Sequence, residues 1–164
     1  MTKIIFLDFD GVLLTDQDAQ DQSDNNGLTR DNYLEKVVFN QDCINNLNAL
    51  LLASDAEIVL STSWALGHSI SDLSHCLMRN GIDPGRLFEY DDPGDRGYMT
   101  PRKMSSGRST EIGWWLEEHP EIERWVAIDD DASILHLKTN IVRTNPRLGF
   151  DRAALSRATS ILAG

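Results

Sequence analysis

Long apolar runs, cysteines and basic residues are all scarce in this chain of 164 residues. No window approaches the roughly 18 consecutive apolar residues of a membrane-spanning helix. The first residues carry one lysine and then an acidic residue inside a short apolar run, which does not fit a secretory signal peptide. Cys43 and Cys76 both fall in helical patterns, so we expect small buried side chains there and neither a disulfide nor a metal site. These absences favour a reducing, cytoplasmic setting.

Positive charge is the scarcer sign, with 15 Lys and Arg against 26 Asp and Glu and a net charge of −11. Such a balance argues against broad electrostatic binding to nucleic acid, which requires many basic side chains. The negative net charge does not exclude a local basic surface at the entrance of a site. The clearest basic segment is residues 96–110, which contain Arg96, Arg102, Lys103 and Arg108 and no acid.

What the chain does contain is an alternation of short apolar runs and amphipathic segments. Its 41% hydrophobic and 25% charged residues are ordinary for a globular protein, and its length suits one domain over residues 1–164. We predict strands at residues 3–7, 57–60, 87–90, 125–128 and 140–144. Helices are predicted after the capping residues Asn40, Ser69 and Asp151, and around Ile112, Trp115 and Leu116. This alternation predicts an α/β fold with a central parallel sheet.

Two segments near the N-terminus have less regular patterns. Residues 15–30 begin with a polar, acidic stretch without a basic residue, and we expect a flexible acidic loop or flap there. Such a loop would serve either as a small lid or as plain solvent-exposed chain. The run from Tyr33 to Phe39 is expected to return from the loop as a short strand.

Polar side chains follow the predicted strands where ligands bind in parallel sheets, beyond the carboxyl ends. They are Asp8 and Asp10, Ser61 and Thr62, Lys103 and Arg108, and Asp129 and Asp130. Because parallel strands end at the same edge, these groups are expected to converge although they span about 120 residues. Each alone has a plainer explanation, namely a turn fragment, a strand-end hydroxyl, a solvated charge and a helix cap. Their order and spacing together favour a shared site.

The side-chain types at this edge suit phosphoryl transfer. Crowded carboxylates repel one another unless a hard cation lies among them, and Mg²⁺ prefers oxygen ligands. A bound Mg²⁺ would keep Asp8 ionised and nucleophilic, with a second acid, Asp10, two residues on. Hydroxyl and backbone N–H groups at Ser61 and Thr62, with a cation from Arg108 or Lys103, suit the oxygens of a phosphate.

Three stretches of the sequence match the motifs of a known enzyme superfamily. They are Asp8-Phe9-Asp10-Gly11-Val12, Ile58-Val59-Leu60-Ser61 and Val126-Ala127-Ile128-Asp129-Asp130. On these stretches the sequence resembles the haloacid dehalogenase (HAD) superfamily of aspartate-nucleophile phosphohydrolases. Further stretches, Ser61-Thr62-Ser63-Trp64 and Arg108-Ser109-Thr110-Glu111-Ile112, resemble its nucleic-acid-repair branch, which is akin to the phosphatase half of polynucleotide kinase-phosphatases. The resemblance covers nearly the whole chain and implies a Rossmann-like three-layer sandwich.

The resemblance also implies roles for individual residues. Asp8 would attack phosphorus and form an aspartyl-phosphate, while Asp10 would act as acid and then as base. The Mg²⁺ ligands would be Asp8, Asp10 through its backbone carbonyl, Asp129 and Asp130. Ser61 would hold the transferring phosphoryl group, with Thr62 beside it.

Two positions depart from the family pattern. A third-motif cation is implied, and Arg108 fits the Arg-x-x-Glu-Ile spacing whereas Lys103 is the usual residue type. We favour Arg108 and keep Lys103. Ala65 stands where relatives in this branch often carry arginine, which removes one substrate contact from the expectation.

The intervals between the motifs leave room for a minimal cap or none, so the implied site is open. An open site suits a phosphorylated polynucleotide end or a nucleotide, and also a phosphoprotein or a small metabolite. A non-catalytic HAD-fold binding or regulatory domain is a further alternative, against which the intact Asp8 and Asp10 pair argues. A receiver domain is disfavoured, because its acidic pair is adjacent and its phosphorylated aspartate follows the third strand.

Overall fold

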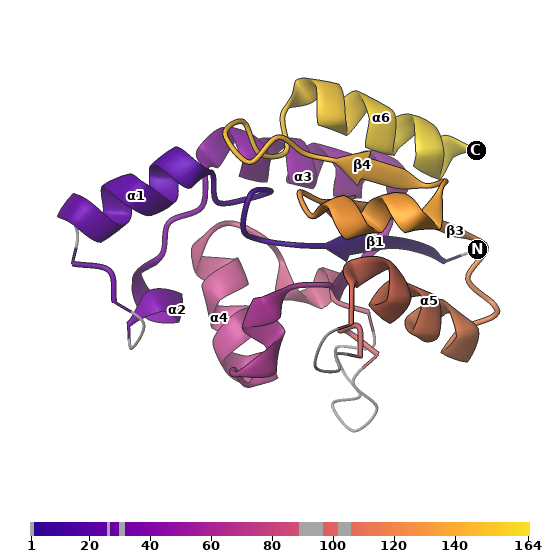
Figure 1. The fold of residues 1–164 in the computed structure, drawn as a ribbon, viewed down its shortest axis with the longest axis horizontal. Coiled ribbons are helices and arrows are strands. Elements are labelled where there is room, and N and C mark those ends of the chain that lie inside the picture. Colours follow the sequence, from indigo (N-terminus) through magenta and orange to yellow (C-terminus); the bar gives the residue numbers. More distant parts are fainter. Residues whose placement is uncertain (1, 26, 30–31, 89–96, 102–105) are drawn as a thin grey trace.

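The computed structural model describes residues 2–25, 27–29, 32–88, 97–101 and 106–164. Within these ranges a wholly parallel, four-stranded sheet has the order β2-β1-β3-β4, of which Figure 1 labels β1, β3 and β4. The strands are β1 (Lys3–Leu7), β2 (Glu57–Leu60), β3 (Arg124–Asp129) and β4 (Ile141–Arg143). The predicted α/β class and four of the predicted strands are therefore confirmed.

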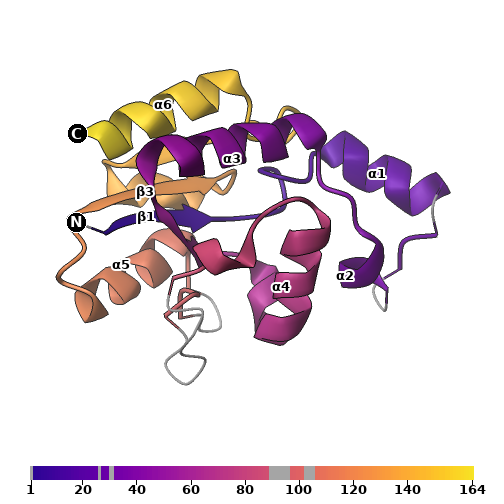
Figure 2. The ribbon, with the colours of Figure 1, turned by 180° about the vertical axis from the view of Figure 1, so that it is seen from behind.

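Helices cover both faces of the sheet and make the predicted three-layer arrangement. The longer ones are α3 (Gln41–Ser54), α4 (Ile70–Arg79), α5 (Arg108–Glu118) and α6 (Arg152–Ala163). Side chains alternate along β1, so Ile5 and Leu7 pack with α3, α4 and α6. Ile4 and Phe6 point to the other face and pack with α5, where the Phe6 and Trp115 ring centroids are 5.2 Å apart. Figure 2 shows α3 and α6 side by side across their face of the sheet.

The acidic segment expected as a loop is largely helical, as α1 (Asp16–Asn25), and that prediction was wrong. Thr15 explains the helix start, because its Oγ1 accepts the N–H of Asp18 at 3.2 Å. Acidic residues in the first turn suit the positive end of the helix dipole. Gln17 and Gln20 each donate to an aspartate four residues on, at 2.7 Å. Local hydrogen bonds thus replace the missing apolar face.

The strand expected over residues 33–39 was also wrong, since the chain forms one helical turn, α2 (Tyr33–Lys36). A strand would need a neighbouring strand to bond its backbone groups. Here the side chain of Arg79 supplies hydrogen bonds to two backbone carbonyls of the segment instead. Its Nη2 donates to the carbonyls of Leu34 at 2.9 Å and Val37 at 2.8 Å. The backbone is therefore satisfied without pairing.

Three smaller predictions can be compared with the structure. Leu87 forms only an isolated parallel bridge with Ile58, and residues 89–90 of the predicted third strand lie outside the described ranges. Cys43 and Cys76 are buried and free, as predicted. Among the described residues, no helix has the length and apolar character needed to cross a membrane.

Candidate active site

The turn after β1 separates two neighbouring acids into different environments. The Asp8 N–H donates to the carbonyl of Ile128 at 3.1 Å, which continues the ladder to β3 and leaves the Asp8 side chain only 4% exposed. The chain then turns back, and the N–H of Leu13 donates to the Phe9 carbonyl at 2.8 Å. Asp10 lies on the outside of this turn and is exposed.

Gly11 makes the turn compatible with the neighbouring strand. Its φ of +71° favours glycine, and an added Cβ would overlap the carboxylate of Asp130. The Gly11 carbonyl accepts the Thr144 hydroxyl at 2.8 Å, which ties the turn to the residue after β4. Glycine here lets the carboxylate of Asp130 come close to the β1 turn.

Three carboxylates gather at the ends of β1 and β3. One oxygen from each of Asp8, Asp129 and Asp130 lies within 4.8 Å of the others. Burial raises the pKa of Asp8 well above its usual range, the charge of Asp129 raises it further, and Arg108 opposes both effects. Burial also raises the pKa of Asp129 to about 6, and that of Asp130 above its usual range.

This group fits a divalent cation. Hard cations prefer carboxylate oxygens, and a cation placed among these three would offset the burial and repulsion that raise their pKa values. The side chain of Asp10 is outside this group and accepts the indole N–H of Trp64 at 2.7 Å. The predicted Asp10 contact to metal, through its backbone carbonyl, stays a prediction.

Arg108 is the cation that the fold places against the carboxylates. It is the first residue of α5, and its backbone N–H donates to the Ser133 hydroxyl at 3.0 Å. The Arg108 guanidinium donates to Asp129 at 2.9 Å, to Glu111 at 3.4 Å and to Asp8 at 3.5 Å. Burial lowers the pKa of Arg108, but these three carboxylates more than compensate and leave it above the usual value. Arg108 is therefore a charged group beside Asp8, as favoured from the sequence, whereas Lys103 lies outside the described residues.

Buried hydroxyls line the edge next to β2. Ser61 and Thr62 are each 1% exposed, and a hydrogen bond from Thr62 lowers the pKa of Asp8. Thr100 is equally buried and lies in register with Ser61, because Leu60 bridges Met99 and the Thr100 N–H donates to the Leu60 carbonyl at 2.9 Å. Within the described part of the chain, the side-chain oxygens of Ser61 and Thr100 have no hydrogen-bond partner. Unpartnered buried hydroxyls at a strand end are available to a ligand.

The structure places three further residues at this edge to which the sequence analysis gave no role, although two of them lie in the stretches that resemble the repair branch. Glu111, 1% exposed, contacts Arg108, and its i+3 spacing on a helix was the available signal. Trp64 contacts Asp10, a pairing across 54 residues that no local pattern marks. Thr100 follows a non-periodic stretch and gave no signal.

A family model described as the HAD domain in Swiss Army Knife RNA repair proteins matches residues 4–155. The matched range contains all eight of the site residues predicted from the sequence. No curated protein and no solved structure matches the chain.

Proposed function

We propose that this chain, which belongs to the family of HAD domains in Swiss Army Knife RNA repair proteins, is a Mg²⁺-dependent phosphatase acting on phosphorylated RNA ends. The observation that carries the proposal is the buried Asp8 carboxylate, which lies close to the carboxylates of Asp129 and Asp130 and contacts the Arg108 guanidinium that also binds Asp129. A nucleophilic carboxylate needs such neighbours to offset the cost of its burial.

Asp8 is the nucleophile of the proposed reaction. One of its carboxylate oxygens forms a bond to phosphorus while the bond from phosphorus to the leaving oxygen breaks. Asp10 gives its proton to that leaving oxygen, so an alcohol departs and an aspartyl-phosphate remains on Asp8. Asp10 then accepts a proton from water, whose oxygen attacks phosphorus and displaces Asp8. Inorganic phosphate leaves, and both carboxyls return to their starting states.

The surrounding side chains hold the reacting groups. The Trp64 N–H orients the Asp10 carboxylate through its 2.7 Å hydrogen bond. Ser61, Thr62 and Thr100 offer hydroxyls to the phosphoryl oxygens, and Arg108 offers positive charge. Asp8, Asp129 and Asp130 would hold Mg²⁺, which when bound supplies charge neutralisation for the carboxylates and the phosphoryl group.

The description of the family supports an RNA end as the substrate. The fold is consistent with this choice, because among the described residues only α1 and α2 lie between β1 and α3, and no large cap covers the sheet edge. A long substrate can reach such an edge.

The test is release of inorganic phosphate from an aryl phosphate, from 3′- and 5′-phosphorylated RNA oligonucleotides, from a phosphopeptide and from a sugar phosphate. We expect Mg²⁺-dependent turnover that Asp8→Asn lowers at least about 10⁴-fold, because the nucleophile is lost. Asp21→Asn, which changes an exposed acid on α1, is the matched control and should keep full activity. A shared unfolding temperature for the two variants shows that the loss is chemical. Normal turnover by pure Asp8→Asn protein would remove the nucleophile assignment, and a preference for phosphopeptide or a sugar phosphate would remove the RNA assignment.

A further inference from the structure

A cavity of about 430 Å³ lies directly beside Asp10. Its described lining is Asp10, Leu28, Thr29, Tyr33, Ser63, Trp64 and His68. Asp10 is the only acidic side chain among these residues, in a chain with a net charge of −11. The remaining lining is aromatic, aliphatic, hydroxyl-bearing or imidazole, which suits a neutral, planar group. The volume falls within the range of pockets that hold small organic ligands, about 300–1,000 Å³.

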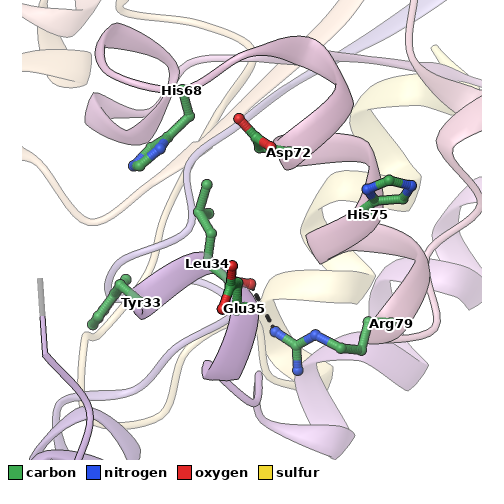
Figure 3. Close-up of a pocket in the computed structure, with 7 residues that line it drawn as sticks. All are labelled: Tyr33, Leu34, Glu35, His68, Asp72, His75 and Arg79. Carbon is green, nitrogen blue, oxygen red and sulfur yellow. Dashed lines mark hydrogen bonds between the residues drawn. The ribbon is translucent and has the colours of Figure 1, made fainter. Parts of the chain in front are cut away.

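A second cavity, of about 480 Å³, adjoins the first and is drawn in Figure 3. The two share Tyr33 and His68, which therefore lie at their boundary. The second cavity is lined further by Leu34, Glu35, Asp72, His75 and Arg79. In Figure 3 His68 precedes α4, His75 and Arg79 follow along that helix, and α2 forms the facing wall.

Hydrogen bonds hold the walls of the second cavity in place. Arg79 fixes α2 against α4 through the carbonyls of Leu34 and Val37. Asp72 accepts the Ser69 N–H at 3.3 Å and the Ser69 hydroxyl at 2.7 Å, so its carboxylate belongs to the cap of α4. His68 and His75 are exposed. The two exposed imidazoles lie on the wall opposite α2, and the guanidinium of Arg79, which bonds to α2, adds positive charge to the lining.

We propose that these two cavities form one track for the last two nucleotides of a phosphorylated RNA strand. The nucleoside that carries the phosphate occupies the cavity beside Asp10, with its base against the rings of Tyr33 and His68. The next nucleotide occupies the second cavity, with its phosphodiester facing His75 and Arg79. The inference rests on the proposed function and extends it to the recognition of the strand.

The direction of the track follows from the role of Asp10. Asp10 protonates the leaving oxygen, so the group bonded to that oxygen must lie on the Asp10 side of the reacting phosphorus. Asp10, and neither Asp8, Asp129 nor Asp130, lines the first cavity. Bases of single-stranded RNA stack on aromatic and imidazole rings, and cationic side chains contact the backbone beside them. A phosphopeptide would place a flexible side chain here, for which the flat rings offer little.

The experiment measures kcat/KM for a phosphorylated mononucleotide, dinucleotide and tetranucleotide of RNA at fixed Mg²⁺, in 3′- and 5′-phosphate series. We expect kcat/KM to rise about tenfold from mononucleotide to dinucleotide and then to level off, because the track holds two nucleotides. His68→Ala should lower kcat/KM about tenfold for the mononucleotide and for the dinucleotide. His75→Ala should remove only the gain from the second nucleotide. His136→Ala, at an exposed histidine that lines neither cavity, is the matched control and should keep the wild-type profile.

Equal kcat/KM for mononucleotide and dinucleotide would overturn the inference, and so would a full dinucleotide gain in His75→Ala. If no substrate, including aryl phosphate, is turned over, the proposed function fails. Binding of a fluorescein-labelled phosphorylated dinucleotide, followed by anisotropy, then decides the inference by itself. About tenfold weaker binding to His68→Ala and His75→Ala than to His136→Ala would support it, and equal binding to all three would overturn it.

Discussion

The Asp8 carboxylate is held where burial opposes its charge. Its exposure is 4%, its pKa is raised by burial and by Asp129, and the Arg108 contact at 3.5 Å compensates only in part. A group in this state gains from any cation that joins Asp129 and Asp130. In the proposed reaction, this unfavourable burial would prepare the cluster to bind a metal ion and a phosphoryl group.

Metal binding should stabilise the protein in a pH-dependent way. The raised pKa of Asp129, about 6, means that the unfolded chain ionises first, so the metal-free fold loses stability as pH rises from about 4 to 6. Mg²⁺ binds the ionised carboxylates and offsets this loss. At Mg²⁺ about 100-fold above its Kd we expect Tm to rise by about 5 °C or more at pH 7.5 and by much less at pH 5.

Differential scanning fluorimetry with Mg²⁺ or EDTA across this pH range measures the effect. Asp129→Asn, which removes one of the three carboxylates, should show a smaller rise at pH 7.5, with Asp21→Asn as control. A rise that is equal at both pH values would contradict the assignment of Asp129 as a ligand.

Thr100 is expected to contribute to turnover through its hydroxyl. Thr100→Val keeps the shape and removes the unpartnered Oγ1, so the fold should lose no stability. Losing a hydrogen bond to a charged phosphoryl oxygen should lower kcat/KM about tenfold, as Ser61→Ala should. Steady-state kinetics on aryl phosphate give the value, and Thr159→Val, in α6 away from the sheet edge, is the control. If kcat/KM is unchanged in Thr100→Val, the Thr100 hydroxyl does not contribute to turnover and the side chain only fills space.

Sequence reasoning placed Asp8, Ser61 and Asp129 because each directly follows an apolar run that ends at one sheet edge, and Asp130 is the next residue. The carboxylate cluster follows from that placement, whereas Arg108 was favoured on the motif spacing of the family resemblance. The position of Thr100 and the contact of Trp64 with Asp10 could not be predicted from the sequence, because they depend on the positions of loops that carry no periodic pattern.

At the scale of elements, strands with continuous apolar runs were predicted well and the segment between β1 and α3 was not. Helix α1 has a polar surface on nearly every side, and side-chain hydrogen bonds make it helical. Helix α2 depends on Arg79, whose contact is 45 residues away in sequence. Hydrophobic periodicity predicts helices and strands that pack against a core. It does not predict segments such as α1 and α2, which are stabilised by polar contacts.

The Gln22 side chain makes two of the contacts that connect α1 to the rest of the molecule, beside the Asp18 carboxylate, which accepts the Asn40 amide at 3.0 Å. The amide of Gln22 donates to the Val38 carbonyl at 2.8 Å and accepts the Val38 N–H at 2.8 Å. Gln22→Ala should therefore loosen α1, with amide exchange in Asp16–Asn25 about tenfold faster or more and exchange in β1 unchanged. Hydrogen exchange read by mass spectrometry gives the rates, with Ser23→Ala, at an exposed position on α1, as control. Equal protection of α1 in both variants would show that other contacts hold it.

At the scale of the whole molecule, the net charge of −11 limits how RNA can be held. The proposed track offers Arg79 and two imidazoles, so few phosphates are neutralised. We expect the slope of log kcat/KM for the dinucleotide against log[KCl], measured from 50 to 300 mM KCl, to be shallower than about −1.5. A slope steeper than about −3 would indicate several further phosphate contacts and contradict a two-nucleotide track.

The position of β1 between β2 and β3 has a consequence for how the protein is made. A ribosome adds ~5–20 residues per second, so Asp129 follows Asp8 by roughly 6–24 seconds. Until β3 emerges, β1 has a partner on one edge only, and an unpaired edge invites association with other chains. Asp8 and its neighbouring carboxylates therefore meet only when the second edge of β1 is closed. The nascent chain therefore carries the proposed nucleophile early, and the proposed site is assembled late.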